Sequence, residues 1–74
     1  MEKHLKDYSF FLSKILKENE EKLLSHEVAI YNNLDLKDFD IMKVKNLCYD
    51  YFTISRNIRF LKKKINDINE ILDN

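Results

Sequence analysis

The chain has 74 residues, with 13 basic and 13 acidic side chains and a single cysteine, Cys48. This length allows one domain, the lone cysteine excludes an intrachain disulfide, and zero net charge argues against a protein that coats or mimics nucleic acid. The longest apolar run, Phe10 to Leu12, is far shorter than a membrane span. We therefore expect a protein of the reducing cytoplasm with no membrane partner.

The first predicted element is a helix over about residues 2–31. Its apolar side chains form two rows: Leu5, Tyr8, Leu12 and Ile15, then Leu16, Leu23 and Ile30. The second row is offset from Leu12 by four residues, which predicts a stutter that locally unwinds a supercoil. Asn19 and His26 fall in the seam of the second half. Asn19 either is buried and fixes the helix register, or faces solvent because of the stutter.

An alternative divides this first segment into two helices. Ser25 can cap a short helix that runs through Tyr31, which would give three helices in all. The two-helix interpretation is favoured because the helix lengths then match, as an antiparallel hairpin requires.

The turn is predicted at residues 32–35. The chain contains no Gly and no Pro, so a tight turn must use Asn or Asp. Asn33 can end the first helix in the left-handed conformation, and Asp35 can cap the second. Leu34 and Phe39 then take the two positions of a hydrophobic staple.

The second predicted helix covers about residues 36–73 and has the clearest pattern in the chain. Its seam residues are Val44, Leu47, Tyr51, Ile54, Ile58, Leu61, Ile65, Ile68 and Leu72. Their alternating spacing of three and four residues is typical of a helix packed lengthwise on another helix. The predicted fold is therefore all-α: an antiparallel two-helix hairpin of the coiled-coil type.

Two helices that bury one stripe each leave large apolar side chains without a partner. Those outside the seams are Phe10, Phe11, Ile41, Tyr49, Phe52 and Phe60, and Met42 lies one heptad before Tyr49. A second apolar flank on an amphipathic helix predicts a second partner. We expect the hairpin to complete a bundle by oligomerisation or with another protein.

A basic cluster follows on the second helix. Five basic residues lie within a nine-residue segment that contains no acidic residue: Arg56, Arg59, Lys62, Lys63 and Lys64. The cluster is either a solvated face or a contact for phosphates or for an acidic protein surface, since aromatic side chains flank it. The candidate partner-binding residues are Met42, Tyr49, Phe52, Phe60, Arg56, Arg59, Lys62 and Lys63.

No motif for catalysis, cofactor binding or metal binding is present. The predicted turn brings His26 near Cys48, but two ligands do not make a metal site. We therefore expect no enzyme activity, no cofactor and no metal.

The pattern favours a non-enzymatic protein–protein interaction module, such as a small adaptor, co-chaperone or regulatory subunit. Its expected partner is itself, as a homodimer, or another helical protein. One alternative is a dimeric hairpin that binds RNA or DNA through the basic residues 56–64. A second alternative is a small inhibitor of a larger enzyme.

Overall fold

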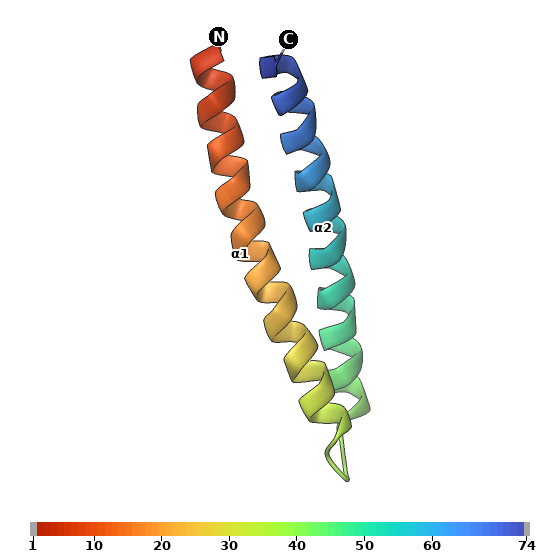
Figure 1. Ribbon diagram of the computed structural model, residues 1–74. Coiled ribbons are helices and arrows are strands. Elements are labelled where there is room, and N and C mark those ends of the chain that lie inside the picture. Colours follow the sequence, from red (N-terminus) through yellow and green to blue (C-terminus); the bar gives the residue numbers. More distant parts are fainter. Residues whose placement is uncertain (1, 74) are drawn as a thin grey trace.

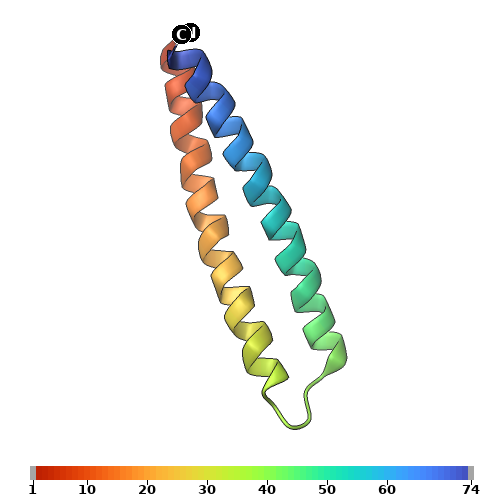
Figure 2. The same cartoon turned by 45° about the vertical axis from the view of Figure 1, so that its right-hand side comes forward.

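The chain folds as two long antiparallel helices joined by one loop, and the computed structural model describes residues 2–73 (Figure 1). Helix α1 runs over Glu2–Leu34 and helix α2 over Ile41–Asp73, with 33 residues in each. The two termini lie at the end opposite the loop (Figure 2). The Cα atoms span 56 × 14 × 14 Å, so the molecule is little longer than one helix. The predicted helical hairpin is confirmed.

Helix α1 is continuous, so the three-helix alternative is wrong. Ser25 is helical and exposed in the middle of α1. The preceding residues 18–22 are mostly Glu and Lys, which are good helix formers. They carry the helix through the position where Ser25 was a possible cap.

The loop covers residues 35–40, not 32–35 as predicted. Asn33 does not take the left-handed conformation. None of the described residues 2–73 has a positive φ angle. Its side-chain amide instead donates to the Ala29 carbonyl at 2.7 Å. The Asp35 N–H donates to the Tyr31 carbonyl at 3.1 Å, which continues the hydrogen bonding of α1 beyond the predicted end.

Helix α2 is capped by Asp40, not by Asp35. The Asp40 carboxylate accepts hydrogen bonds from the Met42 N–H at 2.9 Å and the Lys43 N–H at 3.3 Å, which is the contact that an N-cap makes. The predicted start of the helix at residue 36 is therefore wrong. The staple positions for this cap belong to Phe39 and Val44, not to Leu34 and Phe39.

The predicted seam of α2 is confirmed along its whole length. All nine of its residues are buried or partly buried. Ile58, Leu61 and Ile68 are buried, as is Leu12 of α1. Leu5, Ile15 and Leu16 pack from α1 against the cluster of Leu12, Leu61 and Ile68. The apolar core therefore lies between the helices in the half of the hairpin near the termini.

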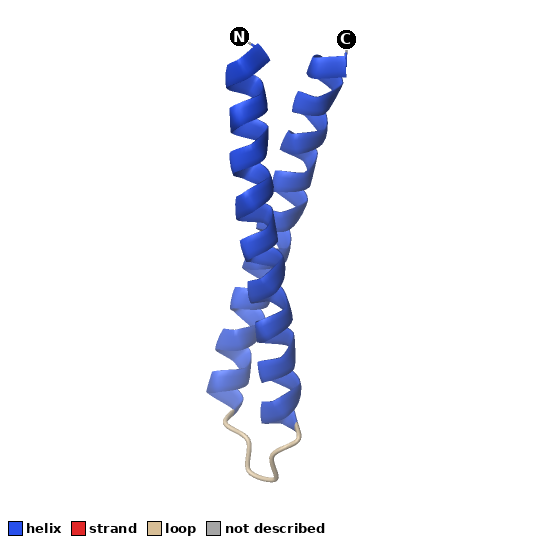
Figure 3. Cartoon of the chain, turned by 60° about the vertical axis from the view of Figure 1, so that its left-hand side comes forward, coloured by secondary structure: helices blue, strands red, loops and turns tan. Residues whose placement is uncertain are grey.

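The seam of α1 differs from the prediction. Tyr8 is 51% exposed, whereas Ser9 is partly buried. Nine of the shielded positions form one row: Leu5, Ser9, Leu12, Leu16, Asn19, Leu23, His26, Ile30 and Asn33. Ile15, Glu27 and Ala29 are partly buried beside this row. The positions of this row alternate by four and three residues without interruption, so α1 packs on α2 without the predicted stutter. The two helices cross obliquely (Figure 3).

Candidate interaction surfaces

The hairpin leaves most of its large apolar side chains in contact with solvent. Only Leu12, Ile58, Leu61 and Ile68 are buried, and none of the described side chains is less than 2% exposed. By contrast, fifteen large hydrophobic side chains within residues 2–73 are exposed. They include all seven that the sequence placed outside the seams. A binding surface must therefore be sought on the outside of the rod.

The outer stripe of α2 runs along the side opposite its seam. Its residues are Met42, Lys45, Tyr49, Phe52, Arg56, Arg59 and Lys63, again spaced by three and four. Because the seam faces α1, this stripe faces away from α1. Six of the eight predicted partner-binding residues lie on it. The other two, Phe60 and Lys62, are exposed on either side of it.

The half of the outer stripe near the loop is apolar and slightly hollowed. Lys45, Cys48, Tyr49 and Phe52 line an open groove of about 170 Å³. The Lys45 ammonium lies 5.9 Å from the centroid of the Tyr49 ring, within the range of a cation–π contact. Phe52 is 65% exposed and meets Tyr51 edge to face, with ring centroids 5.9 Å apart. These contacts hold two aromatic rings at the surface.

The other half of the outer stripe is basic. Arg56, Arg59, Lys62, Lys63 and Lys64 are all exposed. Within the described part of the chain, none of the five forms an ion pair. The Lys64 ammonium lies 5.6 Å from the Phe60 ring centroid. The positive charge of this region is therefore not neutralised by α1.

A polar groove, which the sequence did not predict as a site, lies between the helices. It is open, has a volume of about 430 Å³, and is lined by Asn19, Lys22, His26, Asp50, Thr53, Ile54 and Asn57. The sequence signal was incomplete. Asn19 and His26 were visible as polar seam residues, but the side of α2 that faces them depends on the handedness of the packing.

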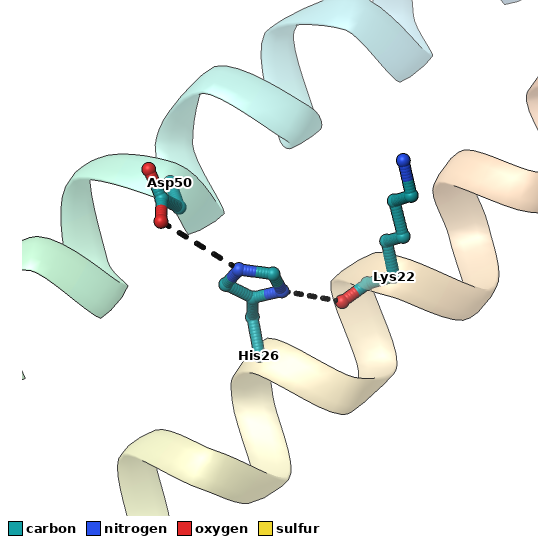
Figure 4. Close-up of polar contacts among 3 residues, drawn as sticks. All are labelled: Lys22, His26 and Asp50. Carbon is teal, nitrogen blue, oxygen red and sulfur yellow. Dashed lines mark hydrogen bonds and ion pairs between the residues drawn. The ribbon is translucent and has the colours of Figure 1, made fainter.

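His26 makes two polar contacts in the polar groove, one to its own helix and one toward α2 (Figure 4). Its Nδ1 lies 2.8 Å from the Lys22 carbonyl, which can only accept, so Nδ1 carries the proton. Its Nε2 lies 3.8 Å from the Asp50 carboxylate, too far for a hydrogen bond. The neutral ring has no proton on Nε2, so an ion pair with Asp50 forms only when the ring is protonated.

His26 and Cys48 do not share a site. His26 lines the polar groove, whereas Cys48 lines the apolar groove of the outer stripe. No cluster of three or more His, Cys, Asp or Glu side chains in residues 2–73 is arranged to hold a metal ion. Neither described helix has a segment both long and apolar enough to cross a membrane.

No protein-family model, curated protein or solved structure matches the chain. The functional argument therefore rests on the surfaces described above.

Proposed function

We propose that this chain is a non-enzymatic protein–protein interaction module that binds another polypeptide through the outer faces of its helices. The observation that carries the proposal is the large accessible surface area of the chain for its mass. The accessible surface is 6199 Å² for a mass of 9.0 kDa. A compact monomer of this mass exposes about 4,900 Å².

The shape of the rod supports the same conclusion. Its radius of gyration is 16.7 Å, whereas a compact domain of this length has a radius of about 11 Å. Burial of each large aliphatic side chain contributes roughly 1.5–3 kcal/mol. Four buried side chains are few against a backbone entropy cost of about 1–2 kcal/mol for every ordered residue. A partner that covers the exposed apolar side chains supplies the missing burial.

The outer stripe of α2 is the binding surface we favour. Tyr49 and Phe52 are aromatic anchors of the type that dominates interface energetics, and Arg56 and Arg59 follow them on the same side of the helix. A helix with an apolar stripe that leads into acidic residues complements this arrangement. An adaptor, a co-chaperone, a regulatory subunit and an inhibitor of an enzyme all act through such a surface.

Binding of RNA or DNA through residues 56–64 is the second candidate function. The five unpaired cations of that segment favour it. Three of the five are Lys, whereas Arg is the residue most used to read bases. Zero net charge also gives the whole molecule no long-range attraction for polyanions.

Site-specific photo-crosslinking in the native cell tests the proposed function. A photoreactive phenylalanine at position 52 should form adducts with a protein that mass spectrometry identifies, either a second copy or another chain. The same probe in place of Phe11, an exposed residue of α1 outside the outer stripe, is the control. The proposal fails if position 52 gives no adduct and the purified chain is a cooperatively melting monomer.

Charge reversal separates the two candidate functions. Arg56→Glu combined with Arg59→Glu should slow association with the partner and leave the helix content unchanged. We expect no binding of a generic single-stranded oligonucleotide at physiological salt. Tight binding that falls steeply with salt and disappears in the double variant would instead establish the nucleic-acid function.

A further inference from the structure

In the half of the hairpin near the loop, the two sides of the seam have opposite chemistry. Lys22, Asp50 and Asn57 line the polar groove, and each directly precedes a seam residue: Leu23, Tyr51 and Ile58. On both helices, residues that precede the seam therefore lie on the groove side. Residues that directly follow a seam position must lie on the opposite side.

That opposite side is mostly apolar in the half of the hairpin near the loop. Most of the residues that follow a seam position there are apolar: Leu24, Tyr31, Leu34, Cys48 and Phe52, with Ile41 one heptad before Cys48. Two residues of opposite charge, Glu27 and Lys45, lie on the same side. We call the six apolar residues the apolar face. All are exposed except Cys48, which is partly buried. The apolar face draws on both helices, whereas the outer stripe belongs to α2 alone.

We propose that the apolar face binds a second copy of this chain, with a two-fold axis parallel to the helices and both loops at the same end. This inference rests on the proposed function and names its partner. The resulting dimer is a four-helix bundle in which α1 of each copy packs against α2 of the other. Every helix then has antiparallel neighbours, as in up-down bundles.

The register of the hairpin fixes which residues meet. Because α1 ends at Leu34 and α2 begins at Ile41, residues whose numbers sum to about 75 lie at the same height above the loop. A two-fold axis along the helices preserves this height between the copies. Leu34 then lies level with the second copy's Ile41, and Leu24 with the second copy's Phe52. Apolar side chains meet apolar side chains.

Charges extend the match beyond the apolar face. The same register places Glu20 and Glu21 of α1 level with the second copy's Arg56. Arg56 belongs to the outer stripe and directly follows Ser55, the residue after the seam position Ile54, so its long side chain borders the covered side. Glu20 directly follows the seam residue Asn19, so it lies on the side that the second copy covers. Neither acid forms an ion pair within residues 2–73 of one chain. An axis across the helices would instead pair α1 with α1 and lose this complementarity.

The available area is sufficient for a stable dimer. The chain exposes about 1,300 Å² more than a compact monomer of its mass. A specific interface of standard size buries about 800 Å² on each partner. An interface on the side of the apolar face leaves the polar groove, which lies on the other side of the seam, open to solvent.

Sedimentation equilibrium of the full chain tests the proposal. The parent should be a dimer at micromolar concentration. Phe52→Glu places an unpaired charge in the interface and should raise the dimer dissociation constant about a hundredfold or more. Phe11→Glu is the matched control, because Phe11 precedes Leu12 and lies on the groove side. It should leave the dissociation constant unchanged.

Cys48 provides a second readout without any substitution, because it is the one cysteine of the chain. The two copies' Cys48 residues lie at the same height, so a short bismaleimide should join two parent chains and should fail to join Phe52→Glu chains.

A charge exchange tests the arrangement of the two copies. Glu20→Arg and Glu21→Arg should weaken the dimer severalfold, and adding Arg56→Glu should restore most of the affinity.

Several outcomes would overturn the proposal. A parent that stays monomeric at high micromolar concentration is one, and a dimer indifferent to both Phe52→Glu and the charge exchange is another. If Phe52→Glu does not fold, the charge exchange decides alone. A monomeric parent whose position 52 crosslinks to a different protein would refute the dimer and leave the proposed function standing.

Discussion

Polar residues of the α1 seam bond to their own helix and not to α2. The amides of Asn19 and Asn33 and the ring of His26 each contact a carbonyl four residues earlier, at 2.7–2.9 Å. No side-chain hydrogen bond joins the two helices in residues 2–73. Among these side chains His26 also approaches α2, where its Nε2 lies 3.8 Å from the Asp50 carboxylate. The apolar residues of the seam must hold the hairpin together.

Ile58 is the residue on which this adhesion can be tested. It is 7% exposed and lies in the middle of the α2 seam. Ile58→Asp buries a charge without a partner, at a free-energy cost that exceeds the stability expected of so small a domain. Far-ultraviolet circular dichroism should show loss of most of the helix signal.

The neighbouring Asn57 supplies the control for Ile58. It is exposed at the edge of the polar groove, so Asn57→Asp adds the same charge where water can reach it. That variant should keep the helix content of the parent. An Ile58→Asp chain that melts like the parent would show that the helices are not held together through position 58.

Sequence reasoning found the seam of α2 and most of the seam of α1, but it placed Tyr8 where Ser9 lies and added a stutter, for one physical reason. All nine seam residues of α2 are apolar or aromatic, so the heptad is visible in the sequence. In α1, Ser9 and Asn19 hold seam positions while the apolar Tyr8 and Ile15 lie beside them. A pattern that follows hydrophobicity drifts onto Tyr8 and Ile15 and then needs a stutter. Packing against α2 decides the register instead.

At the scale of the element, the loop shows how a single cap sets a helix boundary. Three aspartates, Asp35, Asp38 and Asp40, precede α2, and each is a good N-cap by residue type. Sequence alone does not distinguish them, because the choice depends on where α1 ends. In the structure α1 runs to Leu34, and the Met42 and Lys43 N–H groups bond to the Asp40 carboxylate, so α2 begins directly after Asp40.

Asp40→Ala should therefore destabilise the hairpin. The Asp40 carboxylate accepts two N–H groups that are otherwise without a partner in the protein, and loss of such a cap costs about 0.5–2 kcal/mol. For a domain of this size the thermal midpoint should fall by about 4–8 °C for each kcal/mol. Asp35→Ala is the matched control and should leave the midpoint nearly unchanged. Equal effects of the two substitutions would place the boundary elsewhere.

At the scale of the whole molecule, the candidate surface could be predicted only in part. The sequence singled out two aromatic residues outside the seam and two basic residues that follow them at helical spacing: Tyr49, Phe52, Arg56 and Arg59. The difference between the polar groove and the apolar face was hidden. This difference depends on which side of α2 lies beside which side of α1. The structure shows the arrangement, because His26 of α1 and Asp50 of α2 line one groove. The spacing of apolar residues along the sequence does not contain this information.

In the proposed dimer, the division of chemistry between the two sides determines which side of the rod associates. The polar groove and the basic end of the outer stripe keep one side and one end in water. The apolar face is confined to the loop half of the other side. In the proposed dimer the apolar face closes on the second copy, because a two-fold interface uses the same surface on both copies and leaves none of that face to extend the assembly.

If the dimer supplies much of the burial, the stability of the chain must depend on its concentration. Folding coupled to dimerisation gains about 1.4 kcal/mol per mole of dimer for each tenfold rise in chain concentration. The thermal midpoint of the parent, followed by circular dichroism, should rise by about 3–6 °C over that interval. Phe11→Glu should show the same dependence, whereas Phe52→Glu should melt lower and with a flat dependence. The opposite result would be a cooperative transition whose midpoint does not change with concentration. In that case the core of Leu12, Ile58, Leu61 and Ile68 is sufficient to hold the fold, and the exposed apolar side chains do not stabilise it by association.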